Sequence, residues 1–162
     1  MDLILWRHAD AAPLGEDGDD HSRPLTPKGE RQAARMAAWL DRQLSQNTRI
    51  LCSPARRAEQ TVLALNRKFK FRDELSPNSN ADSVLELVKW HDLSQELPKA
   101  PTLVVGHQPW IGEVVSQLLK LPMHEMAFKK GAIWWLHCRE REGQRQIVLL
   151  AVLGPDRLSG LP

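Results

Sequence analysis

Short, continuous apolar runs alternate along the chain with longer segments in which apolar residues recur every three or four positions. A short apolar run that ends in polar residues is typical of a strand buried on both faces, because neither face then meets water. Three such runs predict strands, and two later runs joined by residues 140–144 predict a β-hairpin. The expected strands are Leu3–Trp6, Arg49–Cys52, Thr102–Val105 and the hairpin pair Ala132–Leu136 and Ile147–Leu153.

The segments between these runs predict helices with one apolar face. Thr26 precedes Pro27 and Ser53 precedes Pro54, and a hydroxyl cap followed by proline favours the start of a helix. The acidic, glycine-containing residues 15–23 are expected to form a mobile loop. The expected helices are 27–44, 54 towards 69, 82–97 and 111–119, with a short edge strand at 69–71.

Strands that alternate with helices imply parallel pairing, with helices packed on both faces of the sheet. The predicted fold class is therefore α/β, a three-layer α/β/α sandwich with a mostly parallel central sheet. The length of 162 residues suits one domain, 1–162, in which residues 155–162 are expected to form a short C-terminal tail.

Composition narrows the classes of partner and location. The formal charge is +2, and we recognise no stripe of Lys and Arg interleaved with aromatic residues, so no nucleic-acid partner is expected. The two cysteines, Cys52 and Cys138, fit a reducing compartment. No apolar run approaches the length of a membrane span, and the N-terminus lacks the basic start and long apolar region of a signal peptide. A cytoplasmic location without membrane association is therefore expected.

Basic residues and imidazoles follow three of the expected strands. Arg7 and His8 follow the first, residues 53–57 the second, and Gly106 and His107 the third. Ligands of such sheets bind at the carboxyl ends of the strands, so these groups are expected to meet there. A neutral imidazole with one nitrogen fixed by an acceptor attacks with the other, which makes His8 a candidate nucleophile. The alternative is that His8 merely ends a strand. Arg7 beside it argues against this, because two potentially cationic side chains at one strand end favour a bound anion between them.

The second expected helix adds a candidate anion site. Its N-terminus supplies free N–H groups and a positive dipole, and a start after Ser53 places Ser53, Arg57 and Thr61 on one face. Arg57 can then make a bidentate contact to phosphate oxygens, whereas Arg56 is expected outside. His107 can donate a hydrogen bond to a phosphoryl oxygen or shuttle a proton. The alternatives are an ordinary capped helix with solvated arginines and a histidine that caps a turn.

These residues belong to motifs that occur in a fixed order. The motifs are Arg7-His8, Leu25-Thr26-x-x-Gly29 with Gln32-Ala33, Ser53-Pro54-x-x-Arg57-Ala58-Glu59-Gln60-Thr61, and Gly106-His107. Together they resemble the histidine phosphatase superfamily, also called the phosphoglycerate-mutase-like fold, from Leu3 to about Leu153. The short length and the run Ser22-Arg23-Pro24-Leu25-Thr26 resemble its SixA phosphohistidine phosphatase branch.

The resemblance implies a reaction and roles for these residues. His8 would attack phosphorus and become phosphohistidine, which water would then hydrolyse. Arg7, Arg57 and His107 would surround the phosphoryl oxygens, and Arg23 would add a cationic contact from its loop. No metal or other cofactor is required, because arginines and imidazole neutralise the charge that a metal would otherwise neutralise.

The chain differs from the wider family in the residue that would act as the general acid. Gln108 stands where acid phosphatases of the superfamily carry an aspartate, and Gln108 and Ser53 are expected to contact substrate. Glu74 lies near the region of the mutase acid, but its surroundings match poorly and a surface glutamate is the alternative. A site without a strong acid favours leaving groups that depart more readily than an alkoxide, such as the nitrogen of a phosphorylated imidazole.

The expected function is hydrolysis of the P–N bond of phosphohistidine. The substrate would be a phosphorylated protein, such as a histidine phosphotransfer domain or a phosphocarrier, or a small phosphorylated molecule. The alternative in the same superfamily is a small-molecule phosphomonoesterase that uses Glu74 or another group as acid. A non-catalytic module that binds a phosphorylated ligand is the third reading, which the intact Arg7, His8, Arg57 and His107 disfavour.

Overall fold

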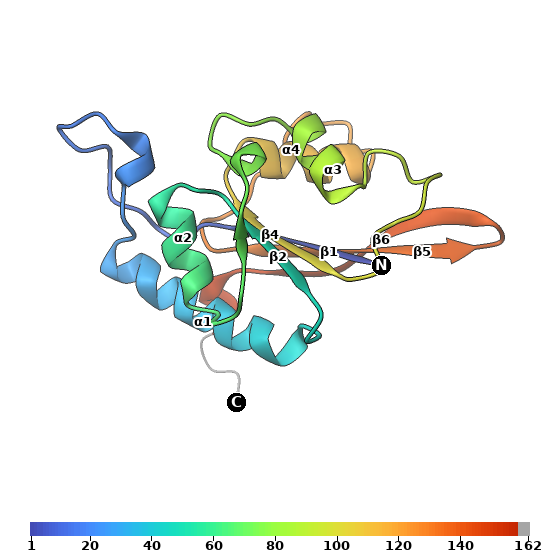
Figure 1. The fold of residues 1–162 in the computed structure, drawn as a ribbon, viewed down its shortest axis with the longest axis horizontal. Helices are drawn as coiled ribbons and strands as arrows, with labels where there is room; N and C mark the ends of the chain where they lie inside the picture. The colour runs from blue at the N-terminus through green and yellow to red at the C-terminus, as the bar shows by residue number, and fades with distance from the viewer. Residues whose placement is uncertain (159–162) are drawn as a thin grey trace.

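Six strands form one mixed sheet, in the order β3-β2-β4-β1-β5-β6, in the computed structural model, which describes residues 1–158 (Figure 1). The central strand β1 pairs parallel with β4 and antiparallel with β5. β2 pairs parallel with β4 and β3, and β5 and β6 form an antiparallel hairpin. The predicted α/β class and mostly parallel sheet are confirmed. The strands are β1 Asp2–Arg7, β2 Arg49–Cys52, β3 Lys70–Phe71, β4 Thr102–Gly106, β5 Ile133–Arg141 and β6 Gln144–Leu153.

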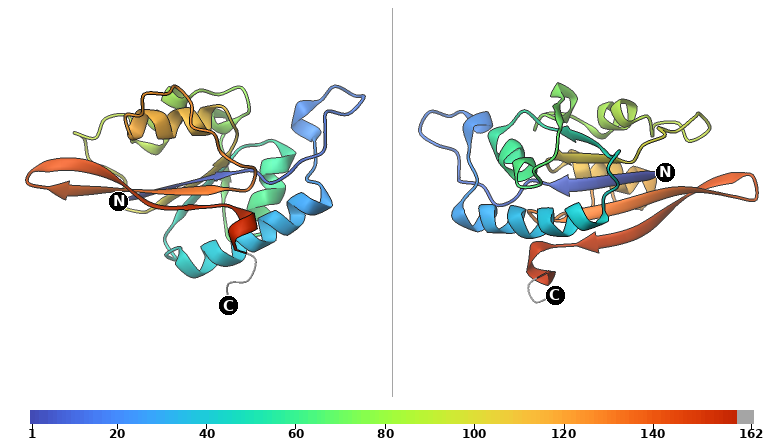
Figure 2. Two further views of the ribbon diagram at one scale, coloured as in Figure 1. Left: turned by 180° about the vertical axis from the view of Figure 1, so that it is seen from behind. Right: turned by 60° about the horizontal axis from the view of Figure 1, so that its bottom comes forward.

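Helices cover both faces of the sheet, with α1 and α2 on one face and α3 and α4 on the other (Figures 1 and 2). Alternate side chains of β1 explain the two layers, since Leu3 and Leu5 pack towards α3 and α4, and Ile4 and Trp6 pack towards α1 and α2. The helices are α1 Pro27–Gln43, α2 Arg56–Leu63, α3 Ala81–Val88 and α4 Trp110–Leu118, with 3-10 helices η1 Asp20–Ser22, η2 Asp73–Leu75 and η3 Pro155–Arg157.

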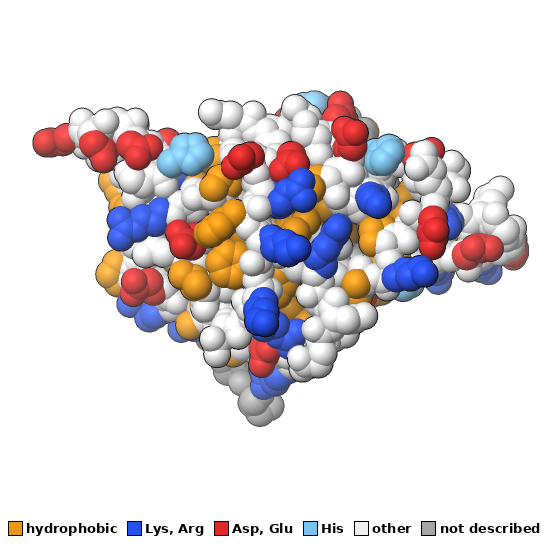
Figure 3. Space-filling view, in the orientation of Figure 1, with side chains coloured by type: hydrophobic (Ala, Val, Ile, Leu, Met, Phe, Trp, Pro, Cys, Tyr) orange, Lys and Arg blue, Asp and Glu red, His pale blue; other side chains and the backbone are white. Residues whose placement is uncertain are grey.

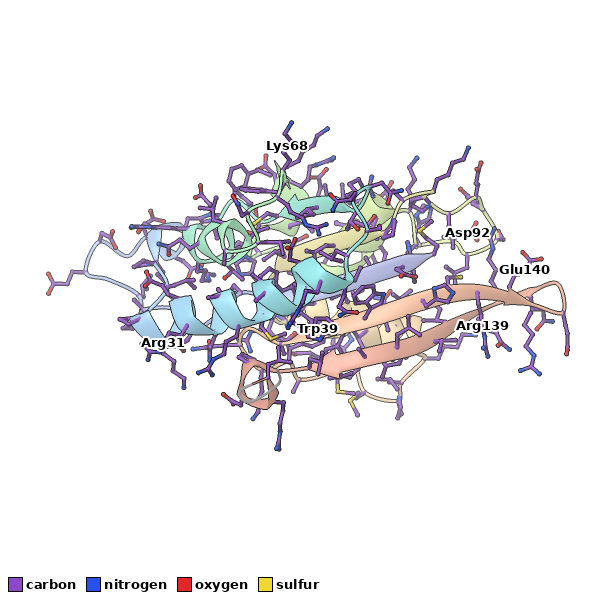
Figure 4. The ribbon with its side chains drawn as sticks, turned by 90° about the horizontal axis from the view of Figure 1, so that it is seen from below. Arg31, Trp39, Lys68, Asp92, Arg139 and Glu140 are labelled. Carbon is purple, nitrogen blue, oxygen red and sulfur yellow. The ribbon has the colours of Figure 1, made fainter. Side chains whose placement is uncertain are left out.

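The start of α1 follows the prediction. The Thr26 hydroxyl accepts a hydrogen bond from the backbone N–H of Gly29, and Pro27 occupies the first turn. Further along, Trp39 of α1 lies against β5, where its ring meets that of Trp135 edge-on at a centroid distance of 6.1 Å (Figure 4). The apolar face of α1 thereby covers the strands that carry the site.

Two helix predictions were too long. α3 ends at Val88 because Lys89 adopts a left-handed backbone, with φ of 61°, and its N–H bonds back to close the helix. The apolar spacing that continues to Leu97 belongs to a loop whose leucines pack against the same core. α2 ends at Leu63 instead of running towards Phe69. In both cases apolar residues of a connecting loop imitated helical spacing.

The hairpin is longer than predicted. β5 and β6 meet at Glu142 and Gly143, whose φ angles of 53° and 74° are those of a tight two-residue turn. The hairpin extends beyond the helical layers (Figure 2). Opposite it in the sheet order lies β3, the other edge strand.

The expected C-terminal tail, 155–162, begins with η3, whose Pro155 is buried. Residues 159–162 of that prediction lie outside the described residues. The assignment of 1–162 to a single domain stays a prediction. Within residues 1–158, no helix combines the length and apolarity needed to cross a membrane.

Candidate active site

The carboxyl ends of three parallel strands bring the predicted residues to one edge of the sheet. Arg7 pairs with Gly106 in the register of β1 and β4, so His8 and His107 leave neighbouring strands side by side. Their ring centroids are 5.1 Å apart. Ser53 follows β2, and its N–H donates to the carbonyl of Val105 on β4. The strand topology therefore assembles the site from segments about fifty residues apart in sequence.

His8 is held rigidly and has a defined tautomer. Its backbone N–H donates to Gly106 and its carbonyl accepts from Gly131, both at 3.0 Å. Its ring Nδ1 lies 2.7 Å from the carbonyl oxygen of Ala9. A carbonyl oxygen only accepts, so Nδ1 carries the proton and Nε2 keeps its lone pair. This is the arrangement that a nucleophilic imidazole needs.

Burial keeps the His8 ring neutral. The residue is 6% exposed. Desolvation, together with the charges of Arg57, Arg7 and Lys130, lowers the pKa of His8 to about 3, although the hydrogen bond to the Ala9 carbonyl acts in the opposite direction. Loss of solvent disfavours the charged form of an imidazole, and nearby cations act in the same direction. The His8 ring is therefore uncharged at neutral pH, with its single proton on Nδ1.

His107 is oriented by Ser53. Its Nε2 lies 2.7 Å from the Ser53 hydroxyl oxygen, which also accepts from the N–H of Ala55 at 3.2 Å. Both residues are buried, and burial beside His8 and Arg57 lowers the pKa of His107 to about 2. Trp110, which is fully buried, packs edge-on against the His107 ring and forms its support. Ser53 thus contacts the second imidazole, where the sequence predicted a substrate contact and a helix cap.

The start of α2 also differs from the prediction. The helix begins at Arg56, two residues later than expected, and its N-cap residue Ala55 makes no capping hydrogen bond with its side chain. The register expectation nevertheless holds, because Arg57 is 4% exposed whereas Arg56 lies on the surface. Thr61 fixes this face, since its hydroxyl donates to the carbonyl of Arg57 and accepts from the N–H of Ala9. α2 is thereby tied to the loop that follows β1.

Arg57 is held by Asp20, a residue of the acidic segment 15–23 that the sequence predicts to be a mobile loop. Its Nη1 donates to the backbone carbonyl of Asp20 at 2.8 Å, and its Nη2 donates to the Asp20 carboxylate at 3.0 Å. Arg23 donates from Nη1 to the other carboxylate oxygen at 2.9 Å and from Nε to the carbonyl of Ala12. Asp20 therefore bridges the two arginines predicted for the site, and both hold the pKa of its carboxyl below the usual value.

Arg7 and the segment that precedes β5 form the side of the site opposite Asp20. Arg7 donates from Nη1 to the carbonyl of Phe128 at 2.5 Å, and burial lowers the pKa of its guanidinium. Lys130 donates to the carboxylate of Asp10 at 2.9 Å and adds positive charge near His8. Neither Lys130 nor Asp10 was singled out in the sequence. The only signal was the position of Asp10 directly after the first motif.

The side chain of Gln108 binds neighbouring segments of the protein. Its Oε1 accepts from the N–H of Gly112, and its Nε2 donates to the carbonyl of Met126 and to the Glu125 carboxylate. The amide thus joins the start of α4 to the segment that carries the Arg7 contact at Phe128. Both polar atoms of the Gln108 amide therefore have partners within the protein, and its contact with substrate stays a prediction.

Glu74 is committed to another partner. Both of its carboxylate oxygens accept from Arg72, at 3.2 and 2.5 Å, and its side chain is 41% exposed. The hydrogen bond with Arg72 holds the pKa of Glu74 below its usual value. A carboxyl group that stays ionised is a poor proton donor, so the geometry argues against Glu74 as the acid.

The assembled site is cationic and partly unsatisfied. Of the buried polar atoms that have no hydrogen-bond partner among residues 1–158, three belong to this site: Nε of Arg7, Nε of Arg57 and Nδ1 of His107. Buried polar atoms are normally paired, so this group suits an anionic ligand with several acceptor oxygens. In the same described range, no three His, Cys, Asp or Glu side chains are grouped to hold a metal ion.

Known proteins are similar to this chain in sequence. The model of the histidine phosphatase superfamily (branch 1) matches residues 3–80. A phosphohistidine phosphatase SixA homolog of Haemophilus influenzae is 32% identical over 131 residues, 73% of this chain and 77% of the relative. Phosphohistidine phosphatase SixA of Escherichia coli is 34% identical over 127 residues, 73% and 74% of the two chains.

The fold agrees with the sequence matches. The structure of the protein histidine phosphatase SixA complexed with tungstate has a TM-score of 0.73 and 27% identity, over 98% of this chain and 99% of that one. This chain therefore belongs to the histidine phosphatase superfamily, in its SixA branch, and is a phosphatase.

Proposed function

We propose that the enzyme hydrolyses the P–N bond of phosphohistidine through a covalent phosphohistidine intermediate on His8. The observation that carries this proposal is the Nδ1–H bond of His8 to the Ala9 carbonyl, which leaves Nε2 unprotonated inside a cationic site. The relatives named as phosphohistidine phosphatases support the substrate class. We propose further that the enzyme acts in the cytoplasm, where Cys52 and Cys138 would remain free thiols.

In the first step, the lone pair of His8 Nε2 attacks phosphorus. A new P–N bond forms to His8 as the P–N bond of the substrate breaks, and the leaving imidazole keeps the bonding electrons and takes up a proton from solvent. Arg7 and Arg57 bind the phosphoryl oxygens and stabilise the charge that spreads over them. For Arg57, this contact replaces the hydrogen bonds to Asp20.

In the second step, water attacks the phosphorus of the phosphoenzyme. The P–N bond to His8 breaks, Nε2 recovers its lone pair, and inorganic phosphate and one proton are released. His107, held by Ser53, contributes a second imidazole beside the phosphoryl oxygens. Arg23 binds the Asp20 carboxylate that also binds Arg57, and it adds positive charge on the side of the site formed by the loop.

The acid-free site supports the choice of leaving group. An alkoxide needs a proton in the transition state, a contribution of about 100- to 10,000-fold. Glu74 is ion-paired with Arg72, and Gln108 carries no acidic proton. Transfer from a phosphohistidine to His8 exchanges one P–N bond for another and needs no strong acid. The phosphomonoesterase alternative therefore has the weaker support.

The test combines trapping with a choice of substrates. Acid-free quenching and mass spectrometry should find phosphate on His8 during turnover, and the His8→Ala variant should form no phosphoenzyme. Phosphoramidate should be hydrolysed at least 100-fold faster than an alkyl phosphate such as phosphoserine. Phosphate on another side chain would contradict the assignment of the nucleophile. Equal rates on the two compounds would favour the phosphomonoesterase.

A further inference from the structure

A basic and aromatic stripe, residues 67–72, includes the two-residue edge strand β3, Lys70–Phe71. Residues 67–72 have the sequence Arg-Lys-Phe-Lys-Phe-Arg, and this pattern corrects the expectation that the chain has no such stripe. β3 is the last strand of the sheet, so no strand pairs with its outer side. Lys68 extends outward at the edge opposite the β5–β6 hairpin (Figure 4). The rings of Phe69 and Phe71 lie on the alternate face and meet edge-on at 5.2 Å.

An open cavity of about 550 Å³ lies beside this stripe, and we call it the basic groove. Four of its seven lining residues are Arg or Lys, and none is acidic. Its apolar lining comes from Ile50 and Phe69. Figure 3 shows Lys and Arg side chains gathered over the middle of the face that carries β2 and β3, with hydrophobic side chains between them.

Most of this charge is uncompensated within the described residues. Arg67 is committed to the end of α1, where it binds Asp41 and three backbone carbonyl groups. Arg49, Lys68 and Lys70 make no ion pair within residues 1–158, and the buried Nη2 of Arg49 has no hydrogen-bond partner there. Like charges held together without counter-charge favour an anionic partner.

The groove leads towards the candidate active site. β3 runs parallel to β2, and the N–H of Arg72 donates to the carbonyl of Cys52 at 3.0 Å. Cys52 precedes Ser53, which holds His107. An extended chain rises about 3.3 Å per residue, so the four residues from Arg49 to Ser53 span roughly 13 Å. A segment bound along this edge therefore runs towards the end of the sheet that carries Ser53 and His107, with β3 and β2 between the segment and β4.

We propose that the basic groove binds an acidic, partly apolar segment of a protein substrate that lies in extended form along β3. Carboxylates of the segment contact Arg49, Lys68 and Lys70, and an apolar side chain packs on Phe69. The open edge of β3 offers backbone hydrogen bonds to such a segment. A free phosphate or a metal ion would leave the apolar lining uncovered, which favours a peptide. The phosphorylated state of the bound protein rests on the proposed function, whereas binding of the acidic segment does not depend on it.

The test uses two synthetic phosphohistidine peptides that differ only in charge. One carries four glutamates placed four to seven residues from the phosphohistidine, and the other carries glutamines there. The wild-type enzyme should have about tenfold higher kcat/KM on the glutamate peptide at low salt, and the preference should shrink as salt screens the charges. The Lys68→Glu/Lys70→Glu variant should lose the preference. The matched control Arg139→Glu/Arg141→Glu makes the same charge change on the far hairpin and should keep it.

Two further measurements separate the groove from the catalytic site. Turnover of phosphoramidate, which is too small to reach the groove, should agree within twofold among the three proteins. Anisotropy of the labelled, unphosphorylated glutamate peptide should show binding that Lys68→Glu/Lys70→Glu weakens about tenfold, even if no protein hydrolyses phosphohistidine. Equal affinity for both peptides, equal losses in both double variants, or preference for a single-stranded oligonucleotide over the glutamate peptide would overturn the proposal.

Discussion

Asp20 occupies the guanidinium donors that a phosphoryl group would need. Its carboxylate and its backbone carbonyl accept the two Nη donors of Arg57, and Arg23 holds the second carboxylate oxygen. An oxyanion that binds both Nη atoms of Arg57 would displace the carboxylate contact. The Asp20→Asn substitution keeps the shape and one acceptor of this side chain but removes its charge. We therefore expect the variant to bind phosphate more tightly.

The expected gain follows from the bonds involved. A hydrogen bond to a charged group contributes about 1.5–3 kcal/mol, and a neutral one about 0.5–1.5 kcal/mol. The Asp20 side chain is 42% exposed, so solvent screens the pair and the small end of that difference applies. A gain of about 1 kcal/mol corresponds to an inhibition constant for inorganic phosphate that is about fivefold lower. The effect should diminish at high ionic strength.

The assay is competitive inhibition by phosphate, with calorimetric titration of tungstate as a second measure of oxyanion binding. Asp19→Asn is the matched control, because Asp19 lies in the same loop, caps the N–H of His21 and makes no contact with Arg57. It removes the same charge and should leave the inhibition constant within twofold. An unchanged or weaker affinity in Asp20→Asn would refute the reasoning and assign Asp20 the task of orienting Arg57 for substrate.

Three other expectations can be checked with the same substrates. Arg57→Ala should lower kcat/KM on phosphoramidate by at least 100-fold, whereas Arg56→Ala should change it less than threefold; equal losses would show that the burial of Arg57 is unrelated to catalysis. Glu74→Gln should leave turnover unchanged, and a large loss would restore it as the acid. Because the folded pKa values of His8 and His107 are depressed to about 3 and about 2, stability should be complete above pH 6.5 and fall below it, by roughly 2 kcal/mol per histidine at pH 5. Denaturant titrations of the wild type and of His8→Gln/His107→Gln should show a shallower pH dependence in the variant.

The sequence predicted the elements whose signals are local. β2 has the predicted bounds, and β1 and β4 exceed theirs by a residue or so, because a buried strand must be continuously apolar. Thr26 and Pro27 determine the start of α1 through bonds made within one turn. The inward face of Arg57 followed from its spacing to Thr61.

The parts that depend on distant contacts were not predictable in this way. Asp20 and Arg57 are 37 residues apart, and only the folding of the loop before η1 brings them together. The direction of Gln108 is set by Met126, on a segment 18 residues away. The early end of α3 depends on the left-handed backbone of Lys89, a residue without the usual preference of glycine or asparagine for that conformation.

Burial of the two imidazoles links the nucleophile to the choice of substrate. The same desolvation that keeps the His8 ring uncharged also lowers the pKa of His107 to about 2, so neither ring is in the cationic form that could act as a general acid at neutral pH. Arg72 keeps Glu74 ionised, and the amide of Gln108 has no acidic proton. An alkoxide would therefore depart without assistance, at a cost of about 3–5 kcal/mol in the barrier. Transfer from a phosphorylated imidazole avoids this increase in the barrier, because one P–N bond replaces another and the leaving ring takes up its proton from solvent. The imidazole of a phosphohistidine is thus a leaving group that can depart from a site whose two histidines are buried and neutral.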